Sequence, residues 1–381
     1  MLLCTCPDRS FGQFPFMDKK RIFLTSAVVA VLGLLVYFQF RHWQSFDWAA
    51  FWSEAHEIRL EHIFHAVALI YVGYILRAIR WKIFLRPVRP HASALGLISP
   101  TLVGFTGLAL LGRPGEFIRP YLIARRENLP FSSQVAAWAV ERIFDIGAFA
   151  VLLALAIFLP DALGSTPHPE YKKNLIVGGV LLLGIVFGLG VGAIIISRKG
   201  EALANWFEIR FSHWTKNLGH RVAQKIREFG AGLNTVHSTF SFLLLVLVSL
   251  LMWYVIALAY HEVTIAYHHA AFGLTDNPLD IPVPQILLLM GSSMVGSILQ
   301  LPGVGGGSQL ATIATLEHIF DVPKELALSC GIMLWLVTFV AVVPVGLILA
   351  HREHLSLRRL SEESHKAPRT EGGTPPAEVV T

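Results

Sequence analysis

Residues 134–159 read QVAAWAVERIFDIGAFAVLLALAIFL and place three ionisable groups within an otherwise apolar run. About 20 apolar residues suffice for a helix to cross a bilayer. Glu141 and Asp145 are four residues apart and would share a helix face, and Arg142 lies three residues before Asp145. A lone charge at the centre of a membrane helix costs about 2.5–3.5 kcal/mol on insertion scales. The three groups can partly neutralise one another and still leave a polar site at membrane depth.

The composition indicates an all-α polytopic membrane protein. Of its 381 residues, 54% are hydrophobic and 15% are charged, whereas soluble domains carry about 25% charged residues. The net charge of +5 does not indicate a nucleic-acid partner, because Lys and Arg are spread through the loops between apolar segments. Cys4, Cys6 and Cys330 predict neither a disulfide framework nor a zinc site.

Eight apolar segments can be recognised, and two of them are interrupted by glycine, proline or serine. The six uninterrupted segments are expected to be full spans, and they are residues 22–40, 63–76, 134–159, 175–197, 240–260 and 326–350. The interrupted segments are residues 93–111, which contain Ser99-Pro100, and residues 286–301, which lead into a glycine-rich run.

The distribution of basic residues favours two re-entrant hairpins over eight ordinary spans. Eight spans would place the basic loops 112–130 and 198–239 outside, against the positive-inside tendency. If both interrupted segments enter and leave on one side, most of the 31 Lys and Arg residues become cytoplasmic. The halves 21–160 and 174–350 then have opposite orientations, as in the inverted-topology repeats of transporters. Eight ordinary spans stay open as the alternative.

This model divides the chain into a transmembrane domain, residues 21–350, and two tails. Residues 1–20 form a cytoplasmic N-terminal tail in which Met17 is a second candidate start, and residues 351–381 form a disordered cytoplasmic tail. A cytoplasmic amphipathic linker helix is expected at about 200–239. The expected location is a bacterial inner membrane, with both termini in the cytoplasm.

Motifs of common enzymes are incomplete in this chain. Residues 303–308 lack the Lys-Ser/Thr of a phosphate loop, and His261-Glu262 begins like a zinc-protease helix, but Ile265 stands where the second His is needed. No nucleophile–His–acid constellation can be placed by spacing. We therefore expect no enzyme, no catalytic residues, no metal ligands and no cofactor.

A second charged motif precedes the polar segment. Residues 112–120 read GRPGEFIRP, and their Gly and Pro would end the first hairpin at the cytoplasmic interface. Arginine can donate two parallel hydrogen bonds to a phosphate. The candidate residues for lipid-headgroup binding are thus Arg113, Glu116, Arg119, Glu141, Arg142 and Asp145. The alternative is that the acids only pair with the arginines to satisfy buried charge.

The glycine-rich run is the candidate gate opposite these charges. Residues 300–309 read QLPGVGGGSQ, and glycines let backbone amides approach a ligand closely. The candidate gating residues are Pro302, Gly303, Gly305, Gly306, Gly307 and Gln309. The alternative is a flexible hairpin tip without a ligand.

Together, and in this order, the two motifs resemble the lysylphosphatidylglycerol synthase transmembrane region, a flippase-like family, over about residues 20–350. Its pattern R-x-G-E-x-x-R is matched from Arg113 to Arg119, and E-R-x-x-D from Glu141 to Asp145. In the family's Pro-Gly-Gly-x-Gly-x-x-Glu segment, Gln309 stands where an acid is usual. A role needing negative charge there, such as holding an aminoacyl amine, is not expected.

This resemblance implies a module that translocates or binds a phosphate-bearing lipid, with membrane lipids as partners. Only residues 351–381 follow the last span, so the synthase domain found in some relatives is not expected. The alternative is a non-transporting subunit that assists a separate lipid-modifying enzyme or glycosyltransferase. A homo-oligomer stays open.

Overall fold

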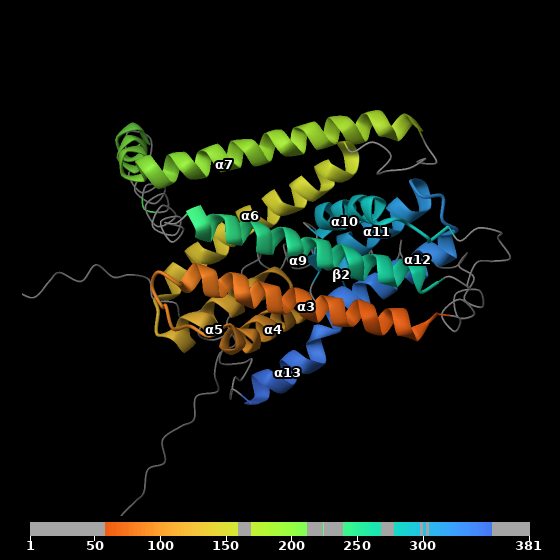
Figure 1. Ribbon diagram of the computed structural model, residues 1–381, viewed down its shortest axis with the longest axis horizontal. Coiled ribbons are helices and arrows are strands. Elements are labelled where there is room, and N and C mark those ends of the chain that lie inside the picture. The colour runs from red at the N-terminus through yellow and green to blue at the C-terminus, as the bar shows by residue number, and fades with distance from the viewer. Residues whose placement is uncertain are drawn as a thin grey trace, which may run out of the picture. The chain divides into compact units, whose positions relative to one another are not determined.

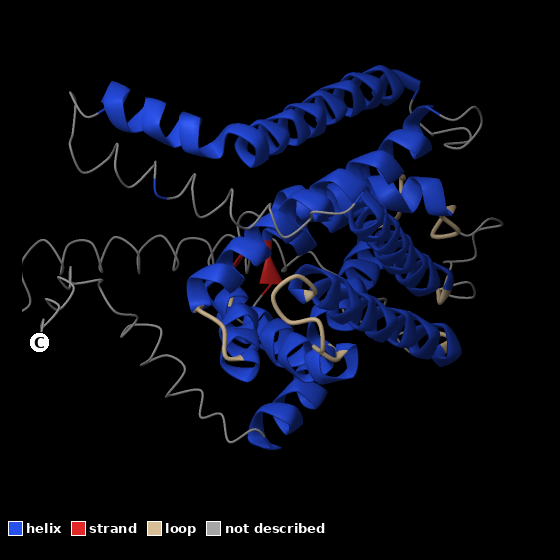
Figure 2. Ribbon diagram, turned by 60° about the vertical axis from the view of Figure 1, so that its left-hand side comes forward, coloured by secondary structure: helices blue, strands red, loops and turns tan. Residues whose placement is uncertain are grey.

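The computed structural model describes seven parts of the chain, which are residues 58–158, 169–211, 224, 239–267, 278–297, 300–301 and 305–352. These parts are almost entirely helical (Figures 1 and 2), as expected for an all-α membrane protein. Several expectations fall outside them, namely those for residues 1–20 and 22–40, Met17, Pro302, Gly303, most of the linker beyond 211, and the tail beyond 352.

Two long antiparallel helices, α3 (Leu60–Leu85) and α9 (Thr239–Ile265), lie side by side (Figure 1). At one end, His62 Nδ1 lies 2.7 Å from Glu262 Oε2. Towards the other end, Arg80 Nη1 donates to Ser249 Oγ at 3.1 Å. The two ends of the α3/α9 pair are called the Glu262 end and the Arg80 end after these contacts. The positions of the other elements are described relative to these two ends.

Helix α3 is longer than its apolar core predicted. The sequence predicts a span that ends at residue 76, followed by a basic cytoplasmic loop over residues 77–90. The helix in fact continues to Leu85, so that prediction is wrong for Arg77 and Arg80. Residues 77–86 contain no Gly or Pro, so nothing local ends the helix before Pro87.

The first hairpin consists of α4 (Ala94–Leu111), a 3-10 turn η1 (Arg113–Phe117) and α5 (Ile118–Glu127). The predicted interruption at Pro100 is wrong, because α4 continues through it. Thr101 Oγ1 donates to the Leu97 carbonyl at 2.7 Å in the same turn, and such hydroxyls help membrane helices to accommodate proline.

The turn comes later than expected, at Gly112, whose φ of 68° and ψ of −146° suit only glycine. The stretch 112–130, expected as a loop, contains η1 and α5. Helix α5 packs closely on α4 because Gly104 leaves room for it. A Cβ on Gly104 would overlap the Cβ of Arg119 and lie 3.0 Å from its Cα.

The open end of this hairpin lies at the Arg80 end. A Cβ on Gly96 of α4 would lie 3.1 Å from Nη2 of Arg126 at the end of α5. Leu97 and Ile123, one from each arm, share a buried cluster with Trp81 of α3. The chain therefore enters and leaves this hairpin on the same side.

The second hairpin consists of α10 (Val283–Gly296), a short ribbon and α11 (Gly307–His318). The ribbon pairs β1 (Gln300–Leu301) with β2 (Gly305–Gly306), antiparallel (red in Figure 2). Helix α11 was not predicted. The two arms approach closely, since a Cβ on Gly296 would overlap the carbonyl of Gly307.

The open end of the second hairpin lies at the Glu262 end. His261 Nδ1 of α9 lies 2.9 Å from the carbonyl oxygen of Ile281, just before α10. The two hairpins therefore enter the helix bundle from opposite ends of the α3/α9 pair. The sequence places the first hairpin within residues 93–111, with Arg113 at its cytoplasmic exit. That prediction is wrong, because Arg113 lies at the turn between α4 and α5. The inverted repeat stays a prediction.

The remaining described helices complete the bundle. They are α6 (Phe131–Phe158), α7 (Pro169–Phe211), α12 (Lys324–Trp335), a π-helical turn (Leu336–Val340) and α13 (Val342–Arg352). Helix α7, with a kink at Lys199, continues past the expected start of the linker at residue 200. Helices at least 18 residues long and apolar enough to cross a membrane are found, among the described residues, at Leu60–Leu85, Ala94–Leu111, Phe240–Ile265 and Lys324–Arg352.

Candidate functional site

A buried ion cluster is centred on Arg80 of α3. Its Nη1 donates to Asp145 Oδ1 at 2.7 Å and to Ser249 Oγ at 3.1 Å, and its Nη2 donates to Glu141 Oε1 at 2.5 Å. The Arg80 side chain is completely buried. Because its partners come from α6 and α9, this arginine ties three helices together.

Arg119 of α5 completes the pairing of Glu141. Its Nη1 donates to Glu141 Oε1 at 3.2 Å and its Nη2 donates to Oε2. Its guanidinium carbon lies 4.4 Å from the ring centroid of Trp81, a cation–π contact. Both oxygens of Glu141 are therefore engaged by arginines, and this carboxylate has the ion-pairing arrangement of the structural alternative.

The cluster contains more positive than negative charge. Arg77 Nη1 lies 3.7 Å from Asp145 Oδ2, and no described residue forms a hydrogen bond with it, although the side chain is only 10% exposed. Arg142 Nη1 lies 3.8 Å from the same oxygen. With Arg80 and Arg119, four guanidinium groups surround two carboxylates. The cluster thus carries an excess of two positive charges.

Helical periodicity explains why these charges converge. Arg77 and Arg80 are three residues apart and lie on one face of α3, as Glu141 and Asp145 do on α6. Trp253 Nε1 of α9 donates to Asp145 Oδ1 at 3.3 Å. Each charged face therefore meets the other in the protein interior.

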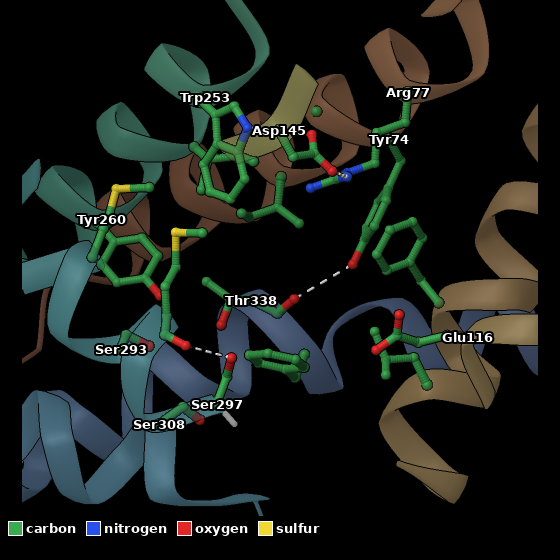
Figure 3. A pocket seen from close by; sticks show the side chains of 18 of the residues that line it. Tyr74, Arg77, Glu116, Asp145, Trp253, Tyr260, Ser293, Ser297, Ser308 and Thr338 are labelled. Carbon is green, nitrogen blue, oxygen red and sulfur yellow. Dashed lines mark hydrogen bonds and ion pairs between the residues drawn. The ribbon is translucent and has the colours of Figure 1, made fainter. Parts of the chain in front are cut away.

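A cavity of about 250 Å³ adjoins this cluster on the side of Arg77, Arg142 and Asp145. Figure 3 shows Arg77 and Asp145 on one side, and Ser293, Ser297 and Ser308 of the second hairpin on the other. The cavity is also lined by apolar and hydroxyl-bearing side chains, which include Ile70, Tyr74, Phe105, Ile146, Trp253, Ile256, Tyr260, Met290 and Thr338.

One wall of the cavity is formed by the π-helical turn. Ala341 N–H donates to the Leu336 carbonyl at 2.8 Å, a pairing five residues apart. The turn places Thr338 at the cavity, and its carbonyl accepts from Tyr74 Oη at 3.4 Å (Figure 3). Single π-turns inside helices occur frequently at functional sites.

The tips of the two hairpins meet at this cavity. Arg113 Nη2 donates to the carbonyl oxygen of Ser297 at 2.9 Å, and Arg113 Nη1 lies 3.3 Å from Glu116 Oε1. Arg113, Glu116 and Ser297 all line the cavity. The cavity between the two facing tips is thus lined by residues of the first charged motif and lies beside the glycine-rich run.

The six predicted headgroup residues fall into two groups. Those lining the main cavity are Arg113, Glu116, Arg142 and Asp145. Arg119 lines only a small adjoining pocket together with Glu116 and Arg142. Its guanidinium, like the carboxylate of Glu141, is used in the buried ion pair.

The glycine-rich run forms a turn, and its described residues have backbone roles. Gly306 has a φ of 106°, which favours glycine, and its N–H donates to Gln309 Oε1 at 3.3 Å. Gly305 pairs within the ribbon, and Gly307 begins α11. The neutral amide at Gln309 therefore accepts a backbone hydrogen bond at the helix start. It also lines a small pocket with Ser308.

Sequence reasoning missed Arg77 and Arg80. Both were counted as loop residues because hydropathy falls at the first arginine after residue 76. The signal was their three-residue spacing together with the uninterrupted helical stretch up to Trp81. Thr338 was also missed, since no sequence pattern within an apolar segment predicts a π-helical turn.

Fold and site together define a multi-pass helical membrane protein with a charged cavity between two facing hairpins. The chain belongs to the family described as the lysylphosphatidylglycerol synthase TM region, whose model matches residues 22–346.

A relative is found among characterised proteins. The chain is 35% identical over 94 residues to the glycosyltransferase AglD of Haloferax volcanii, a match that covers 24% of this chain and 15% of that protein. The similarity thus spans a small part of the relative's length. No solved structure matches the chain.

Proposed function

We propose that this protein is a flippase-like lipid carrier that binds the phosphate of a membrane lipid in the cavity between its hairpins. The observation that carries this proposal is the excess of two positive charges, with Arg77 Nη1 buried beside the cavity and unbonded by any described residue. A buried charged group whose hydrogen bonds are not satisfied is costly. A phosphate would supply the missing negative charge and accept hydrogen bonds from guanidinium groups.

The size of the cavity supports a lipid headgroup as the occupant. Its volume of about 250 Å³ is slightly below the roughly 300–1,000 Å³ of sites that enclose a whole drug-sized ligand. A phosphate with a small headgroup fits this space, whereas acyl chains do not. Ile146 lines the cavity and is 37% exposed on α6, so a lipid could keep its chains on the apolar surface there.

The hairpins suggest how the headgroup would cross. We infer that they are re-entrant, entering from opposite membrane faces, and that the two halves form an inverted-topology repeat. The Arg80 end would face the cytoplasm of a bacterial inner membrane, as the basic loops favour. Because the tips meet at Arg113 and Ser297, opening on either side of this contact would expose the cavity to one face at a time.

Reconstitution tests the proposal. Proteoliposomes would carry fluorescent phospholipid or polyprenyl-phosphate lipid, and leaflet redistribution would be measured for wild type, Arg77→Gln, Arg142→Ala and Arg86→Gln. Arg86 is an exposed residue that follows α3 and serves as the matched control. We expect redistribution by wild type and Arg86→Gln. Redistribution by Arg77→Gln and Arg142→Ala should be at least about tenfold slower, because each variant loses a charge-assisted hydrogen bond of about 1.5–3 kcal/mol to the phosphate. Equal rates in all variants and in empty vesicles would remove the proposal.

A second function is favoured by the comparison with AglD, a protein named as a glycosyltransferase. In this alternative the chain presents a lipid to a separate glycosyltransferase or lipid-modifying enzyme without moving it between leaflets. Affinity purification from native membranes, followed by a lipid-transfer assay with the recovered partner, tests it. Redistribution by the purified chain alone would rule this alternative out.

A further inference from the structure

Three side chains with metal-binding atoms converge at the Glu262 end of the α3/α9 pair, away from the charged cavity. They are His62 and His65 on α3 and Glu262 on α9. One ligand atom from each residue lies within 4.8 Å of the other two. His62 and His65 are three residues apart, so both histidines lie on the face of α3 that meets α9.

The spacing of these atoms approaches that of a zinc coordination sphere. His62 Nδ1 lies 2.7 Å from Glu262 Oε2, and His65 Nδ1 lies 3.7 Å from the same oxygen. Ligands about 2.0–2.1 Å from a tetrahedral zinc ion are about 3.3 Å apart. The two distances fall on either side of that value. The His65 side chain is 68% exposed, so it can rotate towards an ion without disturbing the core.

A further carboxylate is placed to orient His62. Its second ring nitrogen, Nε2, lies 3.8 Å from Glu61 Oε1, and Glu61 is itself paired with Arg59. Metal-binding histidines usually direct their other ring nitrogen to a carboxylate or carbonyl, which fixes the ring and its tautomer. His62 therefore has Glu262 on one side and a second carboxylate near the other.

We propose that His62, His65 and Glu262 form a binding site for a divalent transition-metal ion. Two imidazoles and one carboxylate suit Zn²⁺ best, and three protein ligands leave a fourth position for water. A bound ion would join α3 to α9 at one end, while Arg80 and Ser249 join them at the other. The site would thus keep the two helices in register beneath the charged cavity.

Metal titration of the purified full-length protein in nanodiscs tests this proposal. The affinity tag is removed, and Cys4→Ser and Cys6→Ser are introduced so that thiols bind no zinc. Isothermal titration with Zn²⁺ gives the stoichiometry, and the visible absorption of bound Co²⁺ reports its geometry. We expect one equivalent bound, with tetrahedral Co²⁺ absorption, in this background.

Four variants make the result specific. Glu262→Gln and His65→Ala should abolish the absorption and weaken zinc binding by more than about 100-fold, and Glu61→Gln should weaken it by about 10-fold or more. His318→Ala, which removes an exposed histidine from α11, should bind like the background. Zinc should raise the melting temperature of the background and of His318→Ala, but not of Glu262→Gln. Equal stoichiometry and affinity in Glu262→Gln and the background would overturn the proposal, because a mere His62–Glu262 hydrogen bond predicts that result.

Discussion

Arg113 and Ser297 join the tips of the two hairpins, since Arg113 Nη2 donates to the Ser297 carbonyl oxygen at 2.9 Å. The two residues are 184 positions apart in the chain and belong to different hairpins. Both line the charged cavity. A movement that separates the hairpin tips has to break this contact, so substitution of Arg113 tests its role.

Removing the Arg113 side chain should affect lipid movement more than stability. The side chain is 52% exposed, and one lost hydrogen bond costs about 0.5–1.5 kcal/mol. We expect Arg113→Ala to melt close to wild type but to change the rate of lipid redistribution in proteoliposomes. Arg113→Lys, which keeps the charge without the two-pronged donor, should be intermediate. A large drop in melting temperature in Arg113→Ala would show that the contact is structural.

Neutralising Glu141 should be strongly destabilising. Glu141→Gln removes the carboxylate that pairs with both Arg80 and Arg119. Breaking a buried ion pair costs about 3–5 kcal/mol. We expect a much lower melting temperature, measured by tryptophan fluorescence in detergent. Glu116→Gln is the control, because its partner Arg113 is half exposed and such pairs contribute at most about 1 kcal/mol.

A double variant separates the energy of the Glu141–Arg119 interaction from the effects of removing each charge alone. When Arg119→Gln is added to Glu141→Gln, the second substitution should cost less than it does alone, with a coupling of about 0.5–3 kcal/mol. Additive losses would contradict the bidentate contact between these residues.

Two glycines should respond with opposite signs to the same substitution. Gly104→Ala brings a methyl group against Arg119 Cβ and 3.0 Å from its Cα, so it should destabilise the first hairpin and disturb the Glu141 pair. Gly188 in α7 has no atom of the described chain within 4 Å of an added Cβ. Gly188→Ala should therefore gain up to about 1 kcal/mol of helix propensity. Melting temperatures of the two variants decide this, and equal shifts would speak against close packing at Gly104.

The ends of the two hairpins should be reachable from opposite membrane faces. Arg125 lies in the last turn of α5 and His318 ends α11, and both are exposed. With Cys4 and Cys6 replaced by Ser, and the buried Cys330 retained, an impermeant maleimide should label His318→Cys on intact cells. It should label Arg125→Cys only in inside-out vesicles. Labelling of both from one face would disprove the proposed topology.

The sequence predicted much of the arrangement because charge and apolar length act locally. Residues 134–159 and 240–260 are long apolar runs, and residues 134–158 and 240–260 lie within α6 and α9. Basic residues predicted two re-entrant hairpins, but the first hairpin of the structure extends from α4 to α5 and not over residues 93–111 alone. The turn of the first hairpin was predicted too early, because Pro100 was expected to interrupt the helix, whereas α4 continues through it to Leu111.

The site was predicted only from one side. Glu141 and Asp145 stand out in an apolar run, so their importance is visible in the chain itself. Their counterion Arg80 lies 61 and 65 residues earlier, and no local rule links positions that far apart. The same holds for Glu262. A zinc-protease motif places its histidines within a few residues of the glutamate, whereas the histidines beside Glu262 lie about 200 positions away.

The Arg80 pairing also constrains the order of events during biosynthesis. Arg77 and Arg80 leave the ribosome well before Glu141 and Asp145 on α6. Until α6 arrives, α3 carries two arginines whose release into lipid would be unfavourable. The insertion machinery therefore has to retain α3, or hold its charged end at the interface, until α6 can leave with it. Partitioning of α3 into the bilayer is thus coupled to the synthesis of a later helix.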